Sequence, residues 1–217
     1  MVASLDSSSH VYIDTIISPS TTSAIAQSIQ IPGIAGMENN MVIFEFEKND
    51  HKDLHDIIDN FRMVNAGGFD VCILASSNKP IVYKNGVHIW VRSFDTKNAN
   101  LMILLGFIIL GHPSWKKANI NLFNICSEDD VEKVRKQMLE LVETGRLPIT
   151  SKNVEVIIKD QNKSVKEIIC IKSRDAGLTM IGFNENSFTN NNTELFNGYD
   201  DIGDILFVHS NGVKEIE

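Results

Sequence analysis

Residues 87–125 read VHIWVRSFDTKNANLMILLGFIILGHPSWKKANINLFNI, and three segments of this stretch decide the fold. The segments 87–94 and 119–125 are rich in β-branched and aromatic residues, which is typical of strands. Residues 98–110 between them are typical of a helix that is apolar on every side and must be covered on most of them. Another part of the chain or a partner subunit could supply that cover.

Outward from this stretch, short β-branched runs alternate with segments of helical spacing. Residues 71–74, Val-Cys-Ile-Leu, are apolar in succession, which is typical of strands covered on both faces. We therefore expect an α/β fold with a mainly parallel sheet covered by helices. The eight expected strands are 11–17, 41–47, 71–76, 87–94, 119–125, 153–159, 178–183 and 204–209.

Two further helices have clear ends in the sequence. Apolar residues recur at helical spacing after Asp50, and Gly67-Gly68 is expected to end that helix in a left-handed conformation. Ser127 is a good N-cap for the second helix, which Gly145 and Pro148 are expected to end. The asparagine-rich residues 184–192 are expected to form a mobile loop.

The length of 217 residues fits one large domain or two small, closely packed ones. A strand-helix-strand-helix-strand pattern runs from 11 to 76 and again from 87 to 159, so we expect two similar halves, about 10–80 and 87–217. The seam is expected at 76–86, where Pro80 and Gly86 favour a turn. Residues 1–9 are polar and have no apolar stretch, so no signal peptide is expected.

The formal charge of −8 argues against two classes of partner. It argues against a sequence-independent grip on nucleic acid and against docking on anionic lipid through a polybasic segment. The longest apolar run, 101–110, would rise about 15 Å as a helix, half of a bilayer core, so no membrane insertion is expected. Cys72, Cys126 and Cys170 lie in apolar surroundings without metal-site spacing, so reduced core cysteines in the cytosol are expected.

Catalytic and cofactor motifs are missing from the sequence. It has no dinucleotide fingerprint, phosphate loop or nucleophile elbow, so no catalytic residue, cofactor or metal is assigned. His51, His55 and Asp59 could share one helix face, but solvated side chains are the favoured interpretation. His88 is interpreted as a residue on a strand face, and His112 as a residue that ends a helix.

Two other groups of residues leave alternatives open. Asp200, Asp201 and Asp204 lack the ligand spacing of a calcium loop, and solvated loop charges are favoured. Trp115 with Lys116 and Lys117 is either an interface anchor or a tryptophan packed under a loop.

The segment 87–123 resembles the cytoplasmic C-terminal domain of cation-chloride cotransporters. The resemblance rests on the order of four features: the strand His88-Ile-Trp-Val, the apolar helix Leu101–Leu110, the motif Pro113-x-Trp-Lys, and the strand Ile120-Asn-Leu. Residues 33–42, 176–182 and 206–210 are similar to other strands of that family. Val91, Phe107 and Asn39 depart from its frequent residues, which points towards a prokaryotic member and leaves regulation by phosphorylation in doubt.

The resemblance implies a non-catalytic domain with an α/β architecture related to universal stress proteins. Such a domain follows a transmembrane transporter, forms a homodimer and regulates transport. The partner of this domain would be the transmembrane part, and residues 1–9 would be the linker from its last membrane helix. Met1-Val2 would then open a fragment of a longer protein. Two alternatives remain: a nucleotide-binding protein of the universal stress type, and a free-standing cytosolic adaptor.

Overall fold

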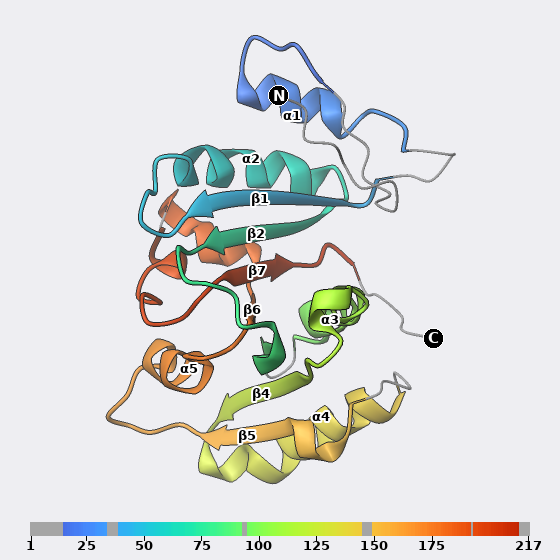
Figure 1. Cartoon of the computed structure of the whole chain (residues 1–217). Coiled ribbons are helices and arrows are strands. Elements are labelled where there is room, and N and C mark those ends of the chain that lie inside the picture. The colour runs from blue at the N-terminus through green and yellow to red at the C-terminus, as the bar shows by residue number, and fades with distance from the viewer. Residues whose placement is uncertain (1–14, 34–38, 93–94, 145–148, 192, 213–217) are drawn as a thin grey trace.

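The computed structural model describes residues 15–33, 39–92, 95–144, 149–191 and 193–212. They form one seven-stranded sheet in the order β1-β2-β7-β6-β3-β4-β5 (Figure 1). The strands are β1 Met41–Glu47, β2 Asp70–Ser76, β3 Val87–Trp90, β4 Ile120–Cys126, β5 Val154–Ile158, β6 Leu178–Gly182 and β7 Ile205–His209. The predicted α/β class with a mainly parallel sheet is confirmed.

The strands run in two blocks of opposite direction. One block consists of β1 and β2, which are parallel to each other. The other consists of β7, β6, β3, β4 and β5, which are parallel to one another. The two blocks meet where β2 pairs antiparallel with β7, with Val71 opposite His209 and Ala75 opposite Ile205. The C-terminal strand thus lies mid-sheet and joins the two blocks.

Helices cover both faces of the sheet. α2 (Leu54–Ala66) and α5 (Val165–Ser173) contribute to the apolar cluster on one face. α3 (Thr96–Leu110) and α4 (Val131–Thr144) contribute to the cluster on the other. The short helix α1 (Thr21–Ser28) packs on α2 at the β1 end of the sheet (Figure 1).

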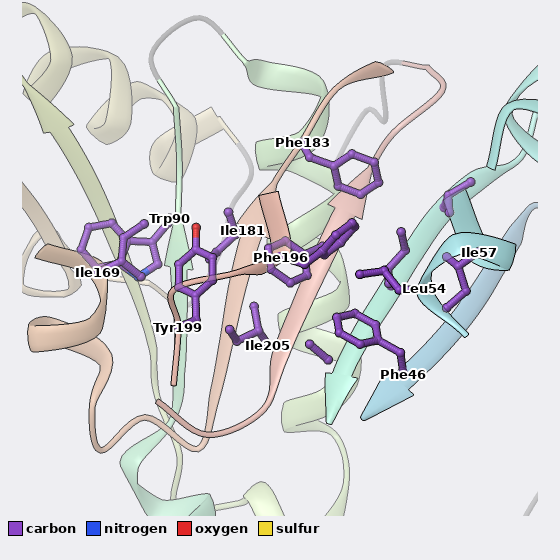
Figure 2. Close-up of a cluster of buried hydrophobic side chains, with 14 of the residues drawn as sticks. Phe46, Leu54, Ile57, Trp90, Ile169, Ile181, Phe183, Phe196, Tyr199 and Ile205 are labelled. Carbon is purple, nitrogen blue, oxygen red and sulfur yellow. The ribbon is translucent and has the colours of Figure 1, made fainter. Parts of the chain in front are cut away.

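An aromatic group fills the core beneath α2 and α5. In Figure 2, Tyr199 and Phe196 lie between the side of Trp90 and Ile169 and the side of Leu54 and Ile57. The Phe196 ring packs edge-on against Phe207 of β7, with 4.9 Å between the ring centroids. The segment between β6 and β7 therefore supplies core side chains as well as the connection.

Two expectations need correction, and a third, the helix that follows an N-cap at Ser127, is confirmed in part. Residues 15–17 of the expected first strand are not in a strand, and 11–14 lie outside the described residues. Residues 185–191 form a 3₁₀ helix, in which the side chain of Phe188 is 1 % exposed, so hydrophobic burial holds most of this expected loop in place. The helix expected from Ser127 starts with a 3₁₀ turn, Glu128–Asp130, and continues as α4; its expected end at 145–148 lies outside the described residues.

The turn chemistry at Gly67-Gly68 is confirmed in part. Gly67 is right-handed, and Gly68 has the positive φ of 87° that favours glycine. Gly86 at the expected seam is under a stronger constraint. It has a φ of 78°, and a Cβ there would lie 2.2 Å from the carbonyl oxygen of Asn119.

Candidate functional site

The histidines weighed as metal ligands do not form a shared site. α2 begins at Leu54, so His51 precedes the helix, and its Nε2 lies 2.9 Å from the carbonyl oxygen of Lys48. Its ring packs edge-on against Phe46. Within the described ranges, no group of three or more His, Cys, Asp or Glu side chains is placed to hold a metal ion.

The acidic segment 200–204 is organised by two lysines. The Lys48 ammonium donates to the carbonyl oxygens of Tyr199, Ile202 and Gly203 at 2.7, 2.9 and 3.2 Å. The Lys79 ammonium donates to the carbonyl oxygens of Asp200 and Asp201. Burial lowers the pKa of Lys48, and nearby Lys79 lowers it further. These backbone oxygens therefore bind protein cations, and the interactions fix the loop before β7.

Asp204 has a separate structural role. Its Oδ1 accepts a hydrogen bond of 2.7 Å from the backbone N–H of Ser77. The bond joins the end of β2 to the start of β7.

Trp115 is packed under a loop within the chain. Its ring meets Tyr83 edge-on at 5.1 Å between centroids, and a Cβ at Gly177 would lie 3.0 Å from it. The exposed fraction of Trp115 is 9 %, whereas Lys116 and Lys117 beside it are exposed. Of the two interpretations, the geometry supports the packed tryptophan.

The cysteines are free and buried, as predicted. Burial raises the pKa of the Cys72 thiol to about 12, so this thiol does not supply a nucleophile at neutral pH.

His88 belongs to a buried polar contact on the α5 side of the sheet. The Ser173 hydroxyl, which is fully buried, accepts from Trp90 Nε1 at 2.9 Å and lies 3.1 Å from His88 Nδ1. Desolvation by burial, and then the charge of Lys172, lower the pKa of His88 to about 4. His88 is thus a residue on a strand face, as expected, and its ring packs against Phe123.

The fold places a crevice at the carboxyl ends of β3 and β6. The chain runs from β3 to β4 and β5 on one side and returns to β6 and β7 on the other. Such a switch point is where open α/β sheets bind ligands. Two hollows flank the start of α3 there. One, of about 330 Å³, is lined by polar residues that include Asn65, Asn98 and His209, and the other, of about 370 Å³, has a more apolar wall that includes Val91 and Met138.

Asn98 holds the start of α3 to this edge of the sheet. Its side-chain N–H groups donate to Asp95 at 2.9 Å and to the carbonyl oxygen of Phe183 at 2.7 Å, and its Oδ1 accepts from the backbone N–H of Ser210 at 2.7 Å. Asn98 is 4 % exposed. One amide therefore joins the ends of β6 and β7 to α3.

A second group of polar contacts joins α2 to the same edge. His209 lies between the carbonyl oxygen of Phe183, 3.2 Å from Nδ1, and Asn65 Oδ1, 3.0 Å from Nε2. Asn65 Oδ1 also accepts from Asn211, and Asn65 Nδ2 donates to the Glu185 carboxylate.

The polar side chains at this edge of the crevice form hydrogen bonds with one another, so they stabilise the fold by joining α2 and α3 to the ends of β6 and β7. Sequence reasoning missed Asn65, Asn98, His209 and Asn211, because isolated asparagines suggest turns and caps rather than a shared site. The available signal was the position of His209 and Asn211 at the carboxyl end of an expected strand.

The outer side of α3 remains uncovered, although the rest of the helix is packed. Ile108 is 65 % exposed and Leu104 is 39 % exposed, whereas Leu101, Met102 and Ile103 are buried. Most of the cover expected for this apolar helix therefore comes from the chain itself.

No family model matches the sequence. Among solved structures, the chain is similar to the cytoplasmic domain of a prokaryotic cation chloride cotransporter, with a TM-score of 0.66 and 14 % identity over 89 % of this chain and 72 % of the other. It also matches a protein assigned to the universal stress proteins of Pseudomonas aeruginosa, with a TM-score of 0.43 and 15 % identity over 76 % of this chain and 62 % of the other. A protein of unknown function from the same species gives 0.42 and 15 % over 80 % and 63 %.

The first match confirms, at the level of fold, the resemblance predicted from residues 87–123. No helix in the described part of the chain has both the length and the apolar character needed to cross a bilayer. The structural match alone shows that the fold of this chain is similar to that of a prokaryotic transporter's cytoplasmic domain.

Proposed function

We propose that this chain is the non-catalytic regulatory domain of a cation-chloride cotransporter, a secondary ion transporter, on the cytosolic side of the membrane. The observation that carries the proposal is the shared fold over 89 % of the chain, together with the order of motifs between His88 and Leu122. The polar groups around Asn98 are hydrogen-bonded to one another, which agrees with a non-catalytic role for this edge of the sheet.

In this proposal, residues 10–217 are the domain, built of two related halves of about 10–80 and 87–217, and residues 1–9 connect it to the transmembrane part. The complete open reading frame tests this assignment directly. Membrane-spanning helices are expected to be encoded upstream of residue 1. A reading frame without them would favour the free-standing adaptor instead.

Homodimerisation is the second element of the proposal. Exposed aliphatic side chains such as Ile43, Ile108 and Ile171 leave apolar surface available for a second copy. Sedimentation velocity over a range of concentrations is expected to show a monomer–dimer equilibrium. A single monomeric species at the highest soluble concentration would contradict it.

Regulation is tested in the whole transporter. Deleting this domain is expected to change the rate of ion uptake into proteoliposomes at equal transporter density. Uptake unchanged by the complete deletion would contradict the regulatory role.

The universal-stress alternative needs a phosphate-binding segment after β6. The residues there are Asn184, Glu185 and Asn186, and the Glu185 carboxylate faces the same crevice edge as Asn65. A carboxylate at this position repels the phosphates of a nucleoside triphosphate and so disfavours its binding. Titration calorimetry with ATP is expected to show no stoichiometric heat, and tight binding would favour the alternative.

A further inference from the structure

Charge is segregated along this chain. Residues 77–126 contain six basic side chains, those of Lys79, Lys84, Arg92, Lys97, Lys116 and Lys117, and one acidic side chain, that of Asp95. This segment therefore carries +5 in a chain of −8, which leaves −13 on the remainder. Such an asymmetry points to a partner with negative charge.

The single acidic group of the segment is turned inward. Asp95 is the N-cap of α3, where its carboxylate accepts from the backbone N–H and the side chain of Asn98. In contrast, Lys84, Lys116 and Lys117 are exposed, and within the described ranges no carboxylate forms an ion pair with them. The positive charge of the segment thus faces outward.

The same segment carries exposed apolar side chains. Ile81, Val82 and Tyr83 are 41 %, 41 % and 40 % exposed, and Ile108 on α3 is 65 % exposed. The 3₁₀ turn Pro113–Trp115, just before Lys116, contacts both α3 and the 3₁₀ turn Tyr83–Asn85. The two apolar groups and the lysines are therefore parts of one surface.

Helical spacing continues this surface along α3. Lys97, Leu104 and Ile108 are seven and four residues apart, so they lie on one stripe of the helix, and all three are exposed. The basic face is defined by these residues and their neighbours: Ile81, Val82, Tyr83, Lys84, Lys97, Leu104, Ile108, Lys116 and Lys117.

We propose that the basic face docks reversibly on an anionic lipid bilayer. Lysine is depleted at the cores of protein–protein interfaces, whereas lysines beside Leu, Ile and Tyr are typical of surfaces that lie at the boundary between headgroups and acyl chains. The net charge of the whole chain argues against binding to anionic lipid. Charges are screened beyond about 8 Å at physiological salt, however, so the positive charge of the basic face determines its interaction with the bilayer. The acidic remainder then orients the domain with this face towards the lipid.

Co-flotation of the full chain with vesicles tests the proposal. Binding is expected to phosphatidylcholine vesicles that contain about one third phosphatidylserine and to be weak with phosphatidylcholine alone. Each lysine near an anionic surface strengthens binding about fivefold, so K84E/K116E/K117E is expected to weaken it about a hundredfold or more. Raising the salt concentration is expected to release the wild-type chain.

A matched control separates local from total charge. K52E/K136E/K152E makes the same change of charge at exposed lysines outside the segment and is expected to leave binding within about threefold. Ile108→Ser is expected to weaken binding several-fold while leaving its salt dependence unchanged, since it removes only apolar contact. Circular dichroism checks that each variant is folded.

Three results would overturn the proposal: no binding to the anionic vesicles, equal losses in the two triple variants, or a K84E/K116E/K117E variant that changes the sedimentation of the lipid-free chain. The last would make the basic face an interface between copies. The proposal does not depend on the transporter assignment, because a free-standing adaptor could dock in the same way. A reading frame without membrane helices would remove the assignment and leave vesicle binding to be judged by itself.

Discussion

The middle and the β1 end of the sheet differ sharply in burial. All five residues of β6 and all five of β7 are buried, whereas only Phe46 is buried in β1. Both faces of the middle strands are covered by helices, while β1 pairs with a neighbour on one side only. Hydrophobic stabilisation is therefore concentrated where the two blocks of strands meet, and the edge contributes less per residue.

The largest expected effect is a cavity in the middle of the sheet. Phe207→Ala removes a fully buried ring that packs against Phe196 and Tyr199. We expect the free energy of unfolding to fall by about 3–5 kcal/mol, as measured by urea denaturation. A loss below about 1 kcal/mol would mean that burial in the middle strands does not carry the stability.

The next effect is a pH dependence in the middle strand β3. The pKa of His88 is about 4 in the folded chain and 6.5 in the unfolded one, so the unfolded state binds the proton first. Stability is therefore expected to fall as the pH drops from about 6.5 to 4, by about 2–3 kcal/mol in total.

The measurement compares unfolding of the wild type and His88→Asn across this pH range. The stability difference between them is expected to change with pH, whereas Ile43→Thr, which removes no titratable group, is expected to give a constant difference. Parallel curves for the wild type and His88→Asn would show that His88 is not desolvated.

A smaller effect is expected where the edge is tied to the loop before β7. Lys48→Met keeps much of the side-chain length but leaves three carbonyl oxygens without their ammonium donor. We expect a loss of about 1–3 kcal/mol in unfolding free energy. Lys52→Met, which removes only an exposed ion pair with Asp50, is expected to cost less than Lys48→Met, and equal losses would contradict the role of Lys48.

The smallest effect is expected at the open edge. Ile43 in β1 is 62 % exposed, so Ile43→Thr is expected to change the unfolding free energy by no more than about 0.5 kcal/mol. The same denaturation assay measures it. A large loss would show that another part of the molecule covers this edge in solution.

Seven of the eight expected strands are present in the structure. They could be predicted because short runs of apolar and β-branched residues mark them in the local sequence. The segment 41–47 was predicted with the bounds that β1 has. α5 was overlooked, although Ser164 and Glu167 form a capping box that marks its start. The asparagines around Phe188 predict a loop, and a single phenylalanine among them gives no local sign that its ring is buried.

Long-range features were harder to predict from sequence. Nothing in the local pattern of 205–209 says that β7 lies antiparallel to β2 in the middle of the sheet, since this pairing joins residues far apart in the chain. The contacts of Asn98 with Phe183 and Ser210 depend on the same topology. The resemblance to a family predicted the fold, whereas the residues alone predicted its elements.

The antiparallel junction of β2 and β7 also has a mechanical consequence. Asp70 at the start of β2 and Ser210 just after β7 lie at the same edge of the sheet, and Met41 is opposite Asp70. Tension that separates Met41 from Ser210 would break the hydrogen bonds between β2 and β7 one after another, because the bonds of an antiparallel pair lie perpendicular to the strands. Under such tension the β1–β2 pair would separate from β7 one bond at a time.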